Sequence, residues 1–235
     1  MDSSEAEPMP ATAADGVELV PFTESRWPPA AAVFVFMILN IAMRIWLPRE
    51  PVVAVPWLLP ALEAAVLGVL VFGYPADLAR QRRWLRPTAL TLAALMVAAA
   101  LWATMRLIDD LIHGSALTND PARLLAAGAL VWLGNNLSFS LLYWLIDSGG
   151  PIMRARHPSP VDFAFTQQMS PELGPYGWRP VFLDYLHLGF TNATAFSPTD
   201  VMPLTHRAKY TMLVQSSVAL ALFGLIVARA VNAFT

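Results

Sequence analysis

Residues 182–203, FLDYLHLGFTNATAFSPTDVMP, are the stretch on which the interpretation of the whole chain depends. The stretch begins as a short, mostly apolar segment and becomes a run rich in Thr, Asn, Ser and Pro. It ends in Asp200-x-x-Pro203, and a long apolar segment at residues 211–233 follows it. A short helix, a polar loop, an acidic residue, a proline and a membrane helix in this order are typical of a pore loop.

The composition sets the class of protein around this stretch. Of the 235 residues, 56% are hydrophobic and 14% are charged, and the mean hydropathy is +0.51. Soluble domains are about a quarter charged, so long apolar segments with short polar links predict an integral membrane protein made of helices, with the lipid bilayer as its surroundings. The chain has no cysteine, which excludes disulfides and thiolate metal sites. A net charge of −2 gives no indication of a nucleic-acid partner.

The chain divides into four regions, which together predict an all-α helical bundle of about six hydrophobic segments. Residues 1–28 are acidic, lack the apolar core of a signal peptide, and are predicted to be a disordered tail. Residues 29–146 are predicted to hold four membrane helices, at about 30–47, 57–74, 88–108 and 124–146. Residues 147–180 form a polar, Pro-rich link that we expect to fold back on the membrane surface or to cap the bundle. Residues 181–235 hold the pore-loop-like segment and the last membrane helix.

Basic residues predict the orientation of the bundle. The strongest positive cluster is at residues 80–86, which places this loop and the N-terminus in the cytoplasm. Residues 178–196 number 19, about 28 Å of helix, which just suffices to cross the bilayer. The favoured interpretation therefore has six hydrophobic segments in sequence, of which the fifth is short and a candidate for a pore-helix-like half-helix. If this fifth segment crosses, the polar loop at 197–209 lies outside. The alternative has five spans and a short fifth segment that re-enters from the cytoplasm. Arginine outnumbers lysine fourteen to one, which is typical of a GC-rich bacterial genome and points to a bacterial inner membrane.

Four residues of the deciding stretch are in register with a known motif. Thr191, Thr194, Asp200 and Pro203 match the spacing of TxxTxxGYGDxxP, and the segment resembles the pore module of the potassium-channel superfamily. The resemblance covers roughly the last quarter of the chain and implies a pore helix, a filter and an inner helix. The filter is degenerate, because residues 196–199 read Phe-Ser-Pro-Thr where the family has Val-Gly-Tyr-Gly.

The whole chain also resembles an uncharacterised bacterial family of multi-pass integral membrane proteins that end in a similar TNATAFSPTD segment. That resemblance implies a common fold. Pro198 removes a backbone donor and no glycine is available for unusual backbone angles, so a potassium-selective ring of carbonyls is not expected.

The first set of candidate site residues lies in and after the short segment. Hydroxyl, amide and carboxylate groups there are candidates for lining a path of permeation: Thr191, Asn192, Thr194, Ser197, Thr199 and Asp200. The alternative is a polar cap, in which Thr199 or Asp200 caps a short turn and Asn192 bonds the backbone near Pro198. Asp184 and His187 share a face and are candidates for a proton or ion contact; the alternative is a carboxylate at a helix start beside an interfacial histidine.

Two further sets lie on other segments. Asn136, Ser140, Tyr143 and Asp147 fall on one helical stripe, which should face other helices or a wet cavity. Arg44 and Glu63 flank the first short link and are predicted to form a structural ion pair. The four histidines lack metal-ligand spacing, and no catalytic motif is present, so neither a metal, a cofactor nor an enzymatic activity is predicted.

Three functions fit these observations. The first is a channel-like membrane protein, assembled as a homo-oligomer, with a degenerate pore loop near its axis. The second is a structural or partner-binding membrane subunit in which the loop is a rigid cap. The third is a proton-coupled carrier that uses Asp184 and His187.

Overall fold

The computed structural model describes residues 24–25, 27–46, 61, 64–65, 67–68, 85–114, 120–156, 161–194 and 200–233. The elements in chain order are α1 (Trp27–Trp46), α3 (Leu85–His113), α4 (Pro121–Ile146), η2 (Asp147–Gly149), α5 (Pro151–Arg156), β1 (Phe163–Phe165), α6 (Thr166–Met169), η3 (Pro171–Leu173), α7 (Phe182–Ala193), β2 (Val201–Pro203) and α8 (His206–Ala233).

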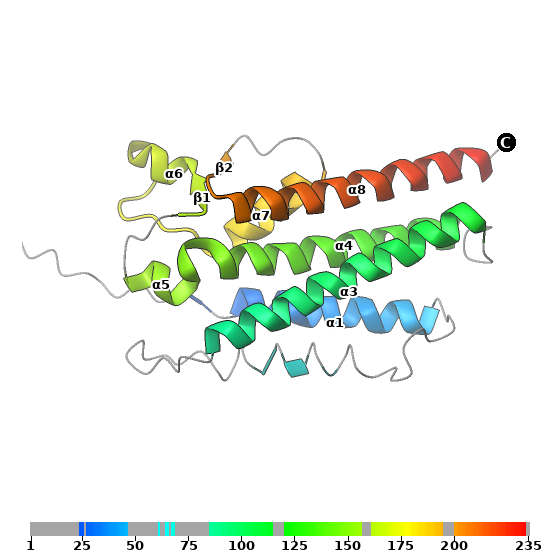
Figure 1. The fold of residues 1–235 in the computed structure, drawn as a ribbon, viewed down its shortest axis with the longest axis horizontal. Helices are drawn as coiled ribbons and strands as arrows, with labels where there is room; N and C mark the ends of the chain where they lie inside the picture. The colour runs from blue at the N-terminus through cyan, green and yellow to red at the C-terminus, as the bar shows by residue number, and fades with distance from the viewer. Residues whose placement is uncertain are drawn as a thin grey trace, which may run out of the picture.

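Helix α4 is the centre of the bundle, and α1, α3, α7 and α8 all pack against it. Helices α1, α3 and α8 run in one direction and α4 runs in the other (Figure 1). Apolar side chains fill the space between them, including Phe36 of α1, Met96 of α3 and Phe139 of α4. Asp120 starts α4 by accepting hydrogen bonds from the free amides of Ala122 and Arg123. The central position explains why α4 carries both polar and apolar buried residues.

Three of the described helices are long and apolar enough to cross a membrane: Arg86–His113, Pro121–Gly149 and His206–Arg229. A shorter apolar helical stretch, Trp27–Met43, lies in α1. These helices support the prediction of a helical integral membrane protein. The count of six segments is not confirmed, because most of the predicted second segment lies outside the described residues.

One end of the bundle is covered by a cap built from η2, α5, β1, α6, η3 and β2 (Figure 1). Helix α4 ends there in a sharp reversal, in which Ser148, Gly149 and Gly150 all have positive φ angles of 52°, 81° and 95°. Glycine adopts such angles without steric cost, so the Gly-Gly pair allows the chain to turn back. The cap includes a two-stranded antiparallel sheet, in which Phe163 pairs with Pro203 and Phe165 with Val201. The fold therefore departs from all-α at this small sheet.

Helix α7 is shorter than a helix that crosses the whole hydrocarbon layer. It has 12 residues, which is about 18 Å of helix, against a hydrocarbon thickness of about 30 Å. Strand β2, which comes after α7 in the chain, lies at the end where α7 starts, because β2 pairs with β1 in the cap. The helix within residues 178–196 is therefore short, as expected for the fifth segment.

Candidate functional site

Helix α7 starts at the cap, and its first turn is held by a side chain of its own. The amide of Val181 donates to Asp184 Oδ2 at 2.7 Å, and the amide of Asp184 donates to the Val181 carbonyl at 2.9 Å. A carboxylate in this position satisfies an amide that has no partner within the helix and favours the positive end of the helix dipole. Asp184, a sequence candidate for proton contact, is thus engaged in starting the helix.

A glycine lets α7 lie directly against α4. A Cβ atom at position 189 would overlap Ser140 Oγ and crowd Asn136 Oδ1. Ser140 Oγ itself donates to the Asn136 carbonyl at 2.7 Å. The ring of Phe190 then meets Trp132 edge-on, with ring centres 5.4 Å apart. These contacts fix the depth to which α7 enters the bundle.

The inner face of α7 ends in a buried network of uncharged polar groups. Asn192 Nδ2 donates to Gln215 Oε1 at 2.7 Å and to the Met212 carbonyl at 3.0 Å. The Tyr143 hydroxyl donates to the same Gln215 oxygen at 2.6 Å, and Gln215 Nε2 donates to the Gly189 carbonyl at 3.0 Å. The network therefore joins α4, α7 and α8. Asn192 faces this network, so its side chain braces helices and is not free to line a path.

The outer face of α7 carries a different set of groups. Residues 183, 187, 190 and 194 form one stripe, and the side chains of His187 and Asp200 are 60% and 45% exposed. His187 Nδ1 lies 3.3 Å from Asp200 Oδ2. The carbonyl of Asp200 accepts hydrogen bonds from the amide and the hydroxyl of Thr166 in the cap, at 3.0 and 2.9 Å. Asp200 thus ties the returning chain both to the middle of α7 and to the cap.

The predicted threonines turn their hydroxyls toward the helix backbone. Thr191 Oγ1 donates to the His187 carbonyl at 3.0 Å, and Thr194 Oγ1 donates to the Thr191 carbonyl, also at 3.0 Å. Bonds of this kind satisfy carbonyls near the C-terminus of a helix. Ser197 and Thr199 lie outside the described residues.

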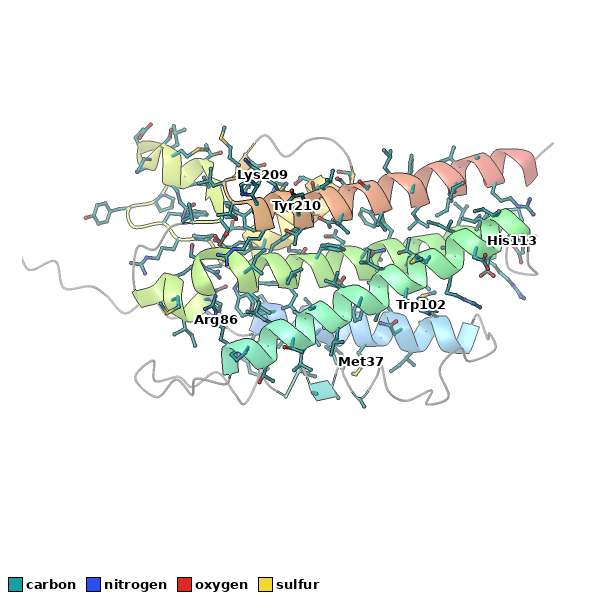
Figure 2. The ribbon with its side chains drawn as sticks, in the orientation of Figure 1. Met37, Arg86, Trp102, His113, Lys209 and Tyr210 are labelled. Atoms are coloured by element: carbon teal, nitrogen blue, oxygen red, sulfur yellow. The ribbon has the colours of Figure 1, made fainter. Side chains whose placement is uncertain are left out.

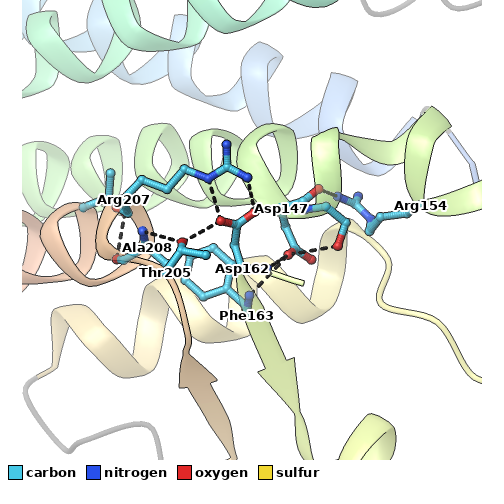
Figure 3. A network of polar contacts seen from close by, with 9 residues as sticks. Asp147, Arg154, Asp162, Phe163, Thr205, Arg207 and Ala208 are labelled. Carbon is cyan, nitrogen blue, oxygen red and sulfur yellow. Dashed lines mark hydrogen bonds and ion pairs between the residues drawn. The ribbon is translucent and has the colours of Figure 1, made fainter. Parts of the chain in front are cut away.

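A charged cluster lies where α4, the cap and α8 meet (Figure 3). Asp147 Oδ1 accepts from the amide of Asp162 at 2.7 Å, and Asp147 Oδ2 accepts from the Tyr185 hydroxyl at 2.5 Å. In return, Asp162 Oδ2 accepts from the amide of Ser148 at 3.1 Å. The guanidinium of Arg207 donates two parallel hydrogen bonds of 2.5 Å to Asp162. The two aspartates therefore hold the C-terminal end of α4 and the start of α8 against β1.

The electrostatic balance at Asp162 favours its ionised form. Burial alone would raise the pKa of this carboxyl, but the hydrogen bonds from Arg207 and Thr205 outweigh burial and hold the pKa below its usual range. The Thr205 hydroxyl donates to Asp162 Oδ1 at 2.5 Å. Asp162 is fully buried and accepts bonds on both oxygens, so it acts as a charged anchor for the start of α8.

The structure brings the predicted stripe of α4 to α7, α8 and the cap. Asn136 and Ser140 face Gly189, Tyr143 joins the amide network, and Asp147 enters the charged cluster. The predicted Arg44–Glu63 pair lies outside the described parts: Arg44 falls in α1 without a described side chain, and Glu63 falls in the gap at 62–63. In the parts of the chain that are described, no group of three or more His, Asp or Glu side chains could hold a metal ion.

Sequence reasoning missed several residues of the site. Gln215 was detectable as a single amide in an apolar helix, because such a side chain is expected to have a polar partner inside the protein. Gly189 was detectable only as a glycine inside an apolar segment. Nothing in the sequence connects Asp162 with Arg207, because they are 45 positions apart and meet only through the cap.

The chain matches no family model, no curated protein and no solved structure.

Proposed function

We propose that this chain is a non-enzymatic, channel-like integral membrane protein in which α7 is a re-entrant helix. The observation that carries the proposal is the course of the chain around α7. The helix enters from the capped end and stops after 12 residues, and β2 leads back to β1 at the same end. Segments that enter a membrane and return to the same side are typical of proteins that make a path for ions or small molecules.

The depth of α7 supports this proposal. Asn192 bonds to Gln215, nine residues into α8, or about 14 Å from the start of that helix. That is close to half the thickness of the hydrocarbon layer. Backbone that stops being helical at this depth is tolerated only inside protein or beside water. The C-terminal end of α7 is therefore expected to lie against protein or water.

The charges support a topology with α7 entering from the cytoplasm. Arg86 and Lys209 lie toward the end where α7 starts (Figure 2). Arg179 lies at the same end, because it donates to the Arg154 carbonyl in the cap, and Asp109 and Asp110 lie near the other end of α3. Basic residues gather on the cytoplasmic side of membrane proteins. The N-terminus, before α1, is then cytoplasmic, and the protein resides in a bacterial plasma membrane. This is the five-span alternative, in which the predicted second segment supplies the remaining span.

The path lies along the outer face of α7, between copies of a homo-oligomer. That face carries His187 and Asp200, which are partly exposed on a surface that would otherwise face lipid. Ionisable groups at membrane depth face protein or water. The inner face of α7 is closed by the Asn192 network, so the outer face is the side that remains for water. Neither face of α7 identifies the permeant species.

The absence of cysteine from the chain makes a direct test practical. Purified His187→Cys and Asp200→Cys proteins are reconstituted in liposomes, and cation flux is measured before and after a charged, water-soluble thiol reagent. We expect flux above that of empty liposomes and a severalfold change after modification. Leu220→Cys, on the apolar outer face of α8, is the matched control and should not respond. No flux at either sign of voltage, over a range of pH, would overturn the proposal.

A second candidate is a structural or partner-binding membrane subunit, and one observation favours it. The amide of Asn192 and the hydroxyls of Thr191 and Thr194 are engaged in bonds within this chain. A rigid cap requires those bonds and does not require a permeation path. Co-purification of one stoichiometric partner, together with no flux, would favour this function.

A further inference from the structure

The side chain of Glu24 occupies a small polar site at the base of α7. Glu24 Oε1 accepts a hydrogen bond from the indole Nε1 of Trp144 at 2.7 Å and another from the amide of Phe182 at 2.8 Å. Glu24 Oε2 lies 3.6 Å from Arg154 Nη2. The side chains of Glu24 and Arg154 are only 9% and 6% exposed. A residue from the segment before α1 is thus buried among groups of α4, α5 and α7.

The groups that receive Glu24 are held in place by other contacts. Arg154 Nη1 donates to the carbonyls of Trp144 and Asp147 at 2.7 and 2.9 Å, and its guanidinium lies 4.9 Å from the centre of the Tyr185 ring. The amide of Phe182 is the first of α7, where amides have no partner within the helix. The donors therefore keep their positions whether or not Glu24 is present.

Two nitrogens of the buried Arg154 guanidinium lack a hydrogen bond within the described part of the chain. Among the residues that the structure describes, Nε and Nη2 of Arg154 have no hydrogen-bond partner. An unsatisfied buried guanidinium is costly, and a planar carboxylate is the group that suits it best. The site offers an indole N–H, a helix-start amide and one cation, which together match a single negative charge. Asp147 and Tyr185 lie close by, and the carboxylate of Asp147 disfavours a ligand with two negative charges.

We propose that Trp144, the amide of Phe182 and Arg154 form a carboxylate-binding site that Glu24 fills from within the chain. The site accepts a free monocarboxylate of the same size when the Glu24 side chain is removed. Replacing glutamate by alanine deletes a methylene and a carboxylate, which is the size of acetate. Through this site Glu24, which precedes α1, is bonded to the first turn of α7.

The test is chemical rescue of the full-length Glu24→Ala protein in detergent or lipid nanodiscs. Thermal unfolding is followed in sodium acetate and in sodium chloride of equal ionic strength at neutral pH. We expect acetate to recover more than half of the melting temperature that the variant loses, with saturation, and chloride or bulky pivalate to recover none. Wild type and Glu24→Gln keep an oxygen in the site and should not respond to acetate. An equal acetate response in wild type and Glu24→Ala would overturn the proposal.

Folding of the variant is itself a readout. Recovery of folded Glu24→Ala only when acetate is present throughout purification would support the site. If Glu24→Ala does not fold in either salt, the site is tested by hydrogen exchange of the milder Glu24→Asp variant. Its shorter side chain withdraws the acceptor, so a peptide that contains the amide of Phe182 should exchange at least about tenfold faster than in wild type. Unchanged exchange there would contradict the assignment.

Discussion

The two polar clusters of this molecule are built from different chemistry. The cluster around Gln215, where α4, α7 and α8 meet, consists of amides, a phenol and backbone carbonyls and contains no charge. The cluster around Asp147 and Asp162, at the capped end, consists of carboxylates, a guanidinium and backbone amides. Uncharged groups cost a few kcal/mol to bury, whereas a buried ion costs several kcal/mol more even when it is paired. The position of each cluster therefore matches what the bilayer tolerates at that depth.

The comparison also separates two tasks. The charged cluster fixes where the chain turns, because it holds the end of α4, strand β1 and the start of α8 together. The uncharged network fixes how deep α7 enters, because it joins the last turn of α7 to α8. If this is correct, changes at the charged cluster should unfold the cap, and changes at the network should displace α7 alone.

The largest effect is expected at Asp147. Asp147→Ala removes the acceptor of Tyr185, of the amides of Asp162 and Phe163, and of Ser148 Oγ. Leaving several buried donors unpaired should destabilise the protein by about 3–5 kcal/mol. Thermal or denaturant unfolding in detergent measures the loss. Asp200→Asn, at a partly exposed ion pair, is the control and should cost less than about 1 kcal/mol. Equal effects of the two variants would contradict the assigned role of the charged cluster.

Gly189→Ala tests the close contact between α7 and α4. The added Cβ overlaps Ser140 Oγ, so α7 must move away from α4, at a cost of about 1–3 kcal/mol. Removing the hydroxyl with Ser140→Ala in the same chain should recover part of that cost, and unfolding of the two single variants and the double variant measures it. Strict additivity of the two substitutions would show that Gly189 and Ser140 do not meet.

Asn192→Leu tests the uncharged network. The change leaves the Tyr143 hydroxyl as the remaining donor to Gln215 Oε1 and should cost about 1–2 kcal/mol, the usual range for a hydrogen bond between membrane helices. The double variant Asn192→Leu with Gln215→Leu should cost less than the sum of the single variants, because both substitutions remove the same Asn192–Gln215 hydrogen bond. If Asn192→Leu destabilises the cap as much as it destabilises the packing of α7, the two clusters act as one unit.

The pH dependence separates the charged cluster from the uncharged one. The pKa of Asp162 is lowered in the folded state, so its contribution to stability is complete above its usual pKa of about 4 and is lost as the pH falls through the lower folded value. The melting temperature of the wild type should therefore fall as the pH drops below about 4. Asp162→Asn should be less stable at neutral pH and show a flatter fall, whereas Asn192→Leu should keep the wild-type slope. A slope unchanged in Asp162→Asn would remove Asp162 from the acid response.

The sequence was informative about the long helices and less so about the clusters. Apolar length alone located α3, α4 and α8, because a span needs about 20 apolar residues and little else. The fifth segment could be read either as a short span or as a half-helix, because its 19 residues just suffice by count. What shortens it is Asp184, which starts the helix inside the segment, and the return of the chain through β2.

The partners of the site depended on contacts that no local pattern encodes. The stripe of Asn136, Ser140, Tyr143 and Asp147 could be read from helical spacing. Its partners Gly189, Gln215 and Tyr185 could not be assigned, because pairing across helices depends on how α7 is turned and how deep it lies. Glu24 was expected to belong to a disordered tail, but in the structure it is buried against Trp144 and Arg154. A single acidic residue in an acidic segment carries no signal of such a contact.

The side of the membrane on which the chain enters and leaves α7 tests the central claim most directly. Tyr176→Cys and Leu204→Cys place single thiols at exposed positions before and after the half-helix in a chain that has no other cysteine. Labelling with an impermeant thiol reagent is compared between intact cells and inverted membrane vesicles. Entry and return on one side predict that both positions are labelled in inverted vesicles and protected in intact cells. Labelling of the two positions from opposite sides would show that residues 182–193 belong to a full crossing and would contradict the account.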